Sequence, residues 1–111
     1  MVITSPPYCN RYDYTRTYAL ELAFLGIGNE RIKELRQSLL TSTVENREKF
    51  EQLKNFYSEQ NSPTAFDRIY NTFTSQEALQ EIISVLEDYK GQKKLNNPNI
   101  VRMVKNYFFE M

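Results

Sequence analysis

The sequence has no histidine and a single cysteine, Cys9, among its 111 residues. One cysteine cannot close a disulfide within the chain, and the lack of histidine removes a common zinc ligand and the base of a Ser-His or Cys-His pair. These absences exclude a disulfide-rich scaffold, a zinc module of the usual ligand types and a hydrolase whose nucleophile depends on histidine. A lone cysteine is also typical of a reducing compartment, so we expect a cytoplasmic location, and we expect no metal site.

An excess of charge of either sign is also lacking, because fourteen basic and fourteen acidic side chains give a net charge of zero. No overall positive field draws the chain to nucleic acid, so any contact with DNA has to be local. Long apolar runs are missing too, since none approaches the roughly 18 to 20 residues that span a bilayer, and the N-terminus has no signal-peptide pattern. We therefore expect neither membrane insertion nor secretion.

The composition that remains is that of a small globular domain, with 41% apolar and 25% charged residues. A chain of this length can build one modest hydrophobic core but not two. The β-branched run at 2–4 predicts a short strand. Pro6 and Pro7 end that strand, because proline has no N–H to donate to a strand ladder.

Apolar residues recur at helical spacing along the rest of the chain and predict about six helices. Gly26 and Gly91 stand where helix C-termini favour glycine, and the spacings 42–45 and 74–77 are those of capping boxes. No internal repeat and no domain linker interrupts the pattern. The sequence therefore predicts a mainly α fold, with one N-terminal strand followed by helices over 15–25, 30–40, 43–60, 63–73, 75–90 and 98–111.

The segment Thr4-Ser5-Pro6-Pro7-Tyr8 resembles the catalytic motif of the DNA amino-methyltransferases, which methylate the exocyclic nitrogen of cytosine or adenine. In that family a buried strand delivers a Ser, Asp or Asn that is followed by Pro-Pro and an aromatic residue. Serine in first place is most typical of cytosine-N4 enzymes, whereas Asp or Asn usually marks adenine-N6 enzymes. The continuation "CNRYDYTRTYALELAFLG", residues 9–26, is also similar to the segment after the motif in several bacterial members.

The resemblance implies roles for four residues of the motif. The side-chain oxygen of Ser5 and the backbone carbonyl of Pro6 would accept hydrogen bonds from the target amino group, and Pro7 would fix the turn that aims them. Tyr8 would stack on the target base after its rotation out of the duplex. The methyl group would come directly from S-adenosylmethionine, without a covalent enzyme intermediate.

A complete enzyme of this family needs a doubly wound α/β domain that holds S-adenosylmethionine at a glycine-rich turn between a strand and a helix. The chain has three glycines, Gly26, Gly28 and Gly91, and none of them follows a second predicted strand. We therefore expect no cofactor binding by this chain alone. The resemblance implies a fragment of a Rossmann-like methyltransferase, inactive by itself, with the catalytic strand, turn and helix in 1–28, a helical insertion in 29–97 and the start of a further helix in 98–111.

Four basic residues are weaker candidates for contact with DNA phosphates. Arg11 and Arg16 flank the tyrosines that follow the motif, and the alternative for both is a salt bridge to a neighbouring acid. Lys93 and Lys94 belong to the stretch 90–105, which carries several cations and no acid. The alternative for this stretch is a solvated helix end, because helix C-termini attract cations.

A second function is open from the sequence. The chain could be a free-standing helical interaction module in which the motif is a relic, with apolar helix faces that form a homo-oligomer or bind a partner protein. The first hypothesis makes DNA the partner of the parent enzyme, whereas the second makes it another protein surface.

Overall fold

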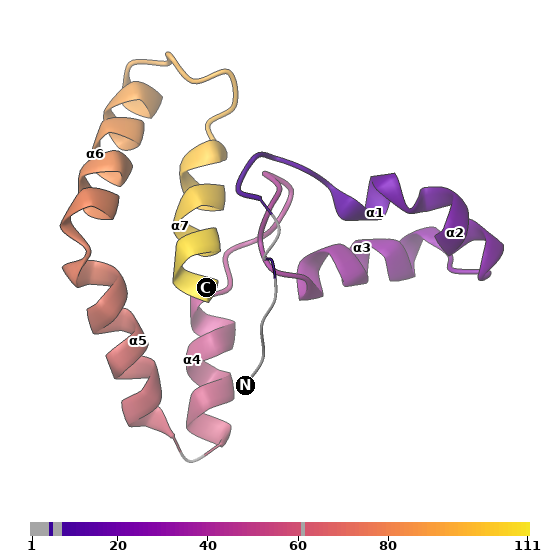
Figure 1. Ribbon diagram of the computed structural model, residues 1–111, viewed down its shortest axis with the longest axis horizontal. Coiled ribbons are helices and arrows are strands. Elements are labelled where there is room, and N and C mark those ends of the chain that lie inside the picture. The colour runs from indigo at the N-terminus through magenta and orange to yellow at the C-terminus, as the bar shows by residue number, and fades with distance from the viewer. Residues whose placement is uncertain (1–4, 6–7, 61) are drawn as a thin grey trace.

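The structure is a computed structural model that describes residue 5 and residues 8–60 and 62–111. Over these residues it contains helices and no strand, and the predicted strand at 2–4 lies outside them (Figure 1). The mainly α prediction is therefore confirmed for the described residues. The helices are α1 (Tyr14–Thr17), α2 (Ala19–Phe24), α3 (Asn29–Ser38), α4 (Phe50–Glu59), α5 (Pro63–Ser75), α6 (Glu77–Gly91) and α7 (Ile100–Glu110).

The helices form two groups that are joined by the loop 39–49 (Figure 1). In the first group, α1 contacts both α2 and α3. In the second, α5 and α6 follow one another along one side, and α4 and α7 pack against them from the other side. The loop between α3 and α4 lies against α7, so it connects the two groups in space as well as in sequence.

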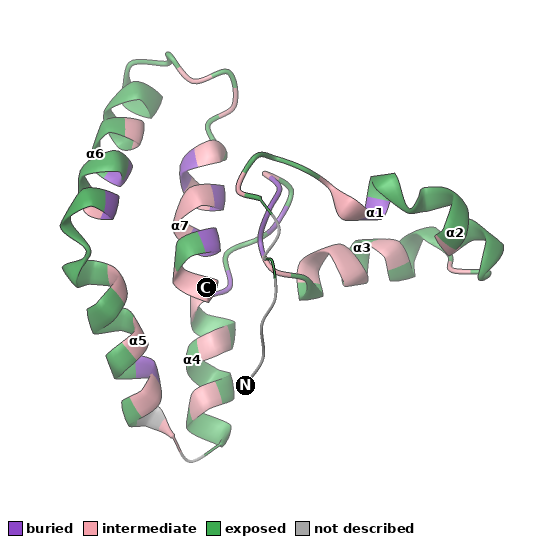
Figure 2. Ribbon diagram, in the orientation of Figure 1, coloured by how far each residue is buried: buried purple, intermediate pink, exposed green. Residues whose placement is uncertain are grey.

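Aromatic and aliphatic side chains from α4 to α7 make the core. The ring of Phe109 lies 5.3 Å from that of Phe50, 5.9 Å from Phe66 and 5.4 Å from Phe73, measured between centroids. These edge-on and tilted contacts are the arrangements that aromatic quadrupoles favour. In Figure 2 the buried residues gather on the inner faces of α5 to α7 and along the loop 39–49. The buried apolar side chains are Phe66, Leu79, Ile83, Val101, Met103 and Tyr107.

The first and third of the predicted helices differ most from the structure. The helix expected over 15–25 is divided at Tyr18 into α1 and α2. The helix expected from 43 begins only at Phe50, because Ser42 does not cap a helix and instead donates its hydroxyl to the carbonyl of Tyr12 at 3.0 Å. A tertiary hydrogen bond has replaced the local cap that the spacing suggested.

The second predicted capping box is also wrong. Helix α5 continues to Ser75, and the hydroxyl of Thr74 donates back to the carbonyl of Tyr70 at 3.0 Å. The residue before α6 is Gln76, and its side chain makes no cap hydrogen bond. Back-bonding by a threonine inside a helix occupies the hydroxyl that a cap would need.

Glycine fulfils its predicted role after α2 but not after α6. Gly26 has a left-handed backbone, with φ of 72°, and the N–H of Ile27 closes the helix end on the carbonyl of Leu22 at 2.9 Å. Gly91 is instead the last residue of α6, and the left-handed residue at that end is Lys93, with φ of 55°. A left-handed backbone costs a residue with a Cβ about 1–2 kcal/mol, so lysine is less favourable than glycine at this position.

Candidate functional site

The motif residues that the structure describes lie at the surface. Ser5 is exposed, and the side chain of Tyr8 is 70% exposed. Pro6 and Pro7 lie outside the described residues. The backbone turns directly after the motif, where the N–H of Asn10 donates to the carbonyl of Tyr8 at 2.9 Å. The ring of Tyr8 is therefore open to solvent.

The segment after the motif is anchored on the rest of the molecule. The ring of Tyr12 meets that of Tyr14 edge-on, with centroids 4.8 Å apart, and its carbonyl accepts the hydroxyl of Ser42. Burial raises the pKa of the Cys9 thiol, so the thiol is protonated at neutral pH and is a poor nucleophile. Burial also raises the pKa of Tyr107 on α7, and the charges of Cys9 and Tyr14 add to that shift.

Asp13 is the centre of an ionic cluster at the start of α1. One oxygen of its carboxylate accepts hydrogen bonds from the N–H and the hydroxyl of Thr15, at 3.0 and 2.6 Å. The other oxygen pairs with Arg36 at 3.0 Å and with Arg16 at 3.2 Å. Both arginines also pair with Glu45 in the loop 39–49. The cluster therefore ties the segment after the motif to α3 and to the loop.

This cluster lowers the pKa of Asp13. Burial alone favours the neutral acid, but the hydrogen bonds from Thr15 and the charges of Arg36 and Arg16 outweigh it. A carboxyl with a lowered pKa in the folded state contributes stability above its ordinary pKa of 3.8, and loses it as the pH falls through the folded value. The stabilising effect of the cluster is thus present at neutral pH and absent in strong acid.

The change Asp13→Asn should lower the free energy of unfolding at about pH 7 and change it much less in acid below both pKa values, where the wild-type carboxyl is also neutral. Urea titrations of both proteins across this range measure the difference. The exposed Glu30, which pairs with Lys33 on α3, is the matched control, and Glu30→Gln should show little pH-dependent loss. An equal loss for Asp13→Asn at both extremes of pH would contradict the assignment.

The structure places the four residues that were predicted to contact DNA in two different environments. Arg16 is held by Asp13 and Glu45, which is the salt-bridge alternative, although the acid at 45 was not foreseen. Arg11 is exposed and extends from the segment after the motif to the side chain of Asn96, with Nη1 and Oδ1 3.5 Å apart. Lys93 and Lys94 precede Asn96 in the loop between α6 and α7. Three of the four residues are therefore brought to one place.

A buried polar cluster in the loop 39–49 was missed by sequence reasoning. The Nζ of Lys49 pairs with Glu110 at 3.1 Å and donates to the carbonyl of Leu39, and both side chains are about 90% buried. The same carboxylate accepts the N–H of Thr41 at 2.9 Å and its hydroxyl. The run Thr41-Ser42-Thr43 was the available signal, because such residues favour turns and caps over helix interiors.

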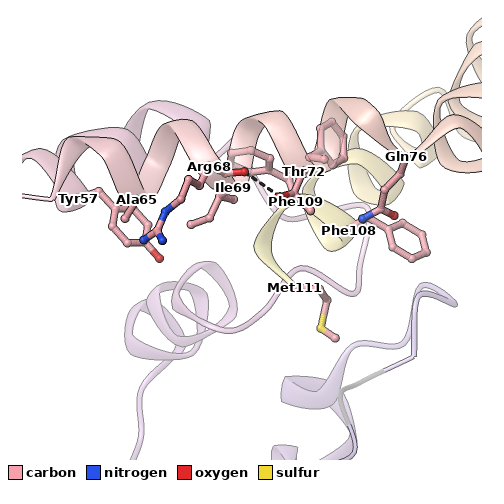
Figure 3. Close-up of a pocket in the computed structure, with 10 residues that line it drawn as sticks. Tyr57, Ala65, Arg68, Ile69, Thr72, Gln76, Phe108, Phe109 and Met111 are labelled. Carbon is pink, nitrogen blue, oxygen red and sulfur yellow. Dashed lines mark hydrogen bonds between the residues drawn. The ribbon is translucent and has the colours of Figure 1, made fainter.

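The surface has two apolar hollows beside α5 and α7, of about 570 and 360 Å³. The larger one carries Arg68 and Gln76 among apolar side chains that include Ile69, Phe108 and Met111 (Figure 3). Within the described residues, no group of His, Cys, Asp and Glu could hold a metal ion, and no helix is long and apolar enough to cross a membrane.

Comparison with known proteins gives a consistent answer over nearly the whole chain. The chain is 49% identical over 110 residues to the Type II methyltransferase M.BsoBI of Geobacillus stearothermophilus. It is 52% identical over 110 residues to M.AvaI of Nostoc sp. strain PCC 7120 and of Anabaena variabilis. Each match covers 99% of this chain but only 20–22% of the relative. No family model and no solved structure matches the chain. The chain is therefore homologous to a segment that makes up about one fifth of these Type II methyltransferases.

Proposed function

We propose that this chain is the catalytic-motif segment of a DNA methyltransferase that transfers a methyl group from S-adenosylmethionine to the exocyclic amino group of cytosine or adenine. The observation that carries the proposal is the identity of about half the residues to Type II methyltransferases over 99% of the chain. A match of that extent includes the segment 4–8, whose residues resemble the catalytic motif of this reaction. The serine at position 5 favours cytosine-N4 over adenine-N6.

The chemistry explains why an acceptor and an aromatic ring are needed. An exocyclic amino nitrogen is a poor nucleophile, because its lone pair is conjugated with the base. Acceptors on its hydrogens, supplied by Ser5 Oγ and the Pro6 carbonyl, localise that pair on nitrogen. In the complete enzyme, the nitrogen would form a bond to the methyl carbon as the bond from that carbon to the sulfonium sulfur breaks, with S-adenosylhomocysteine as the leaving group and one proton released from nitrogen to solvent. Stacking of the rotated base on Tyr8 is worth about 1–3 kcal/mol, which offsets much of the cost of unstacking it.

The cofactor does not fit this chain by itself. S-adenosylmethionine supplies the electrophilic methyl group, and enzymes of this kind hold it at a glycine-rich turn on a parallel sheet. The described residues form no sheet, and only three glycines occur in the whole chain. We therefore assign cofactor binding to the four fifths of the relatives that this chain does not match.

The exposed surface of α2 supports a larger assembly. Phe24 is 92% exposed and Leu20 is 85% exposed, and Leu25 beside them is also exposed. Burial of each such side chain stabilises a protein by about 1.5–3 kcal/mol, so a protein surface that covered α2 would bind it favourably. In the proposed function that surface is the rest of the methyltransferase, which would dock on the helix directly after the catalytic motif.

A chimera tests the proposed function. The corresponding segment of one of the relatives is replaced by this chain, and methyl transfer from labelled S-adenosylmethionine to unmethylated DNA is measured, with mass spectrometry of the nucleosides to identify the methylated base. We expect a methylating chimera and N4-methylcytosine as its product. If the product were N6-methyladenine, the methyltransferase assignment would stand, and the methylated base would be adenine instead of cytosine. A folded chimera without methylation, while the parent relative is active, would contradict the proposal.

The exposed face of α2 also keeps the interaction module as a second candidate, because another copy of the chain could cover Leu20, Phe24 and Leu25. Sedimentation of the isolated chain separates the two functions. A defined dimer with cooperative unfolding, together with an inactive chimera, would favour the module. A monomer together with an active chimera would leave the methyltransferase segment as the function.

A further inference from the structure

Two basic residues occupy backbone positions that favour glycine. Arg11 and Lys93, with φ of 66° and 55°, are the non-glycine residues with a left-handed backbone in the described part of the chain. At Gly26 the same conformation, with φ of 72°, is adopted by glycine, which has no Cβ to strain. Non-glycine residues with a left-handed backbone cluster at functional sites, where the role of the side chain outweighs the backbone strain. The shared property of Arg11 and Lys93 is a long cationic side chain.

Arg11 contacts the loop that carries Lys93, although the two residues are far apart in sequence. The guanidinium of Arg11 reaches Asn96, 85 residues further along the chain, at 3.5 Å. Lys93 and Lys94 lie three and two residues before Asn96, so their backbones are within about 11 Å of it. Figure 1 shows the segment before α1 passing close to the start of α7, where the loop from α6 arrives. We call Arg11, Lys93, Lys94 and Asn96 the basic patch.

Among the residues that the structure describes, no acid forms an ion pair with Arg11, Lys93 or Lys94. Other cations of the stretch 90–105 are occupied, since Lys90 and Lys105 pair with Glu87 and Arg102 donates to the carbonyl of Val44. No Asp or Glu occurs before position 13 or between positions 88 and 110. Lys94 lies 5.7 Å from the ring centre of Tyr89. The patch thus concentrates three positive charges in a chain whose net charge is zero.

We propose that the basic patch binds the phosphate backbone of duplex DNA beside the target base. This inference rests on the proposed function, which makes DNA the polyanion in question. Arg11 follows Tyr8 by three residues, so their Cα atoms are at most about 11 Å apart and a ring that stacks on a base has a cation within reach of nearby phosphates. Arginine and lysine bind phosphates, and the amide of Asn96 adds a neutral donor between them.

Binding through three cations has a defined salt dependence. The logarithm of the association constant should fall with the logarithm of salt concentration with a slope of about −2.7 for three phosphate contacts. An increase from about 50 to 200 mM salt then weakens binding about 40-fold. Removal of one contact reduces the slope to about −1.8, and the same increase in salt weakens binding about 12-fold.

The test measures the 111-residue chain with a fluorescent DNA duplex by anisotropy, over a series of salt concentrations, and compares it with Lys93→Asn and Arg11→Asn. Asparagine tolerates the left-handed backbone, so each variant loses a charge without new strain. We expect thermal stability that is unchanged or higher, together with weaker binding and a shallower slope. The matched control is Lys54→Gln, which removes an exposed cation on α4. Figure 1 shows α4 apart from the loop between α6 and α7.

The result distinguishes this inference from the proposed function. No DNA binding at low salt, equal slopes for all variants, or the same loss for Lys54→Gln would overturn the basic patch, even if the chimera methylates DNA. Tighter binding of duplex RNA than of duplex DNA of equal length would overturn the choice of DNA. An inactive chimera together with patch-dependent DNA binding would leave the patch in place and remove the methyltransferase assignment.

Discussion

Glu110→Ala is expected to destabilise the chain by about 3–5 kcal/mol, because it leaves the ammonium group of Lys49 buried without a counter-charge. The stability of a domain of this size is about 5–15 kcal/mol in total, so a large share of it should be lost. Chemical denaturation followed by circular dichroism, with the midpoint and slope compared to wild type, measures the change. This loss should exceed that of any exposed ion pair in the molecule.

The structural basis is a carboxylate with several partners at one end of α7. Glu110 accepts the ammonium of Lys49 and both the N–H and the hydroxyl of Thr41, which is fully buried. Removal of the carboxylate also leaves the N–H of Thr41 without its acceptor, and an unpaired buried donor is costly. The two residues are 69 positions apart, so this contact holds the loop 39–49 against α7.

Two variants make this prediction sharp. The double change Lys49→Met with Glu110→Leu removes both charges and should recover part of the loss, because apolar pairs often replace buried ion pairs at little cost. The change Glu87→Ala breaks the exposed pairs with Lys105 and Lys90 and should cost less than about 1 kcal/mol. If Glu110→Ala were no worse than Glu87→Ala, the buried cluster would have no special role in stability.

Ser5→Ala in the methylating chimera is expected to reduce kcat by at least about 100-fold, the loss usual for a hydrogen-bonding group that acts in the transition state. The proposed reason is that the target amino nitrogen loses the acceptor that localises its lone pair. Ser5 is exposed in this structure, so the free energy of unfolding should hardly change. Methyl transfer under saturating DNA and cofactor, with a parallel denaturation curve, separates the two effects.

Conservative and remote changes control this experiment. Ser5→Asn keeps a side-chain acceptor and introduces the residue that adenine-N6 enzymes often have, so it should retain more activity than Ser5→Ala. Ser58→Ala removes an exposed hydroxyl on α4 that donates to the carbonyl of Lys54 in the same helix, and should leave activity unchanged. Full activity of the Ser5→Ala chimera would disprove the assigned role of the motif, whatever the fate of the basic patch.

Local patterns predicted much of this fold. Helices α3, α5, α6 and α7 follow from apolar residues at helical spacing, and each overlaps the range that the spacing indicates. Gly26 takes the left-handed backbone expected after α2 because glycine adopts it without strain. The proposed function also began in a local pattern, the segment Thr4-Ser5-Pro6-Pro7-Tyr8. Such features depend on residues within a few positions of one another, so the sequence contains them directly.

The remaining features depend on which distant residues meet. Ser42 has capping-box spacing, but its hydroxyl bonds to the carbonyl of Tyr12, 30 positions away, so it caps no helix. The partner of Lys49 is 61 positions away and that of Arg11 is 85 positions away. Local spacing carries no information about such pairs, because the path of the chain between them decides whether they touch. By itself the sequence determined a helical segment with a methyltransferase-like motif, whereas only the tertiary structure joined the loop 39–49 to α7 and Arg11 to the α6–α7 loop.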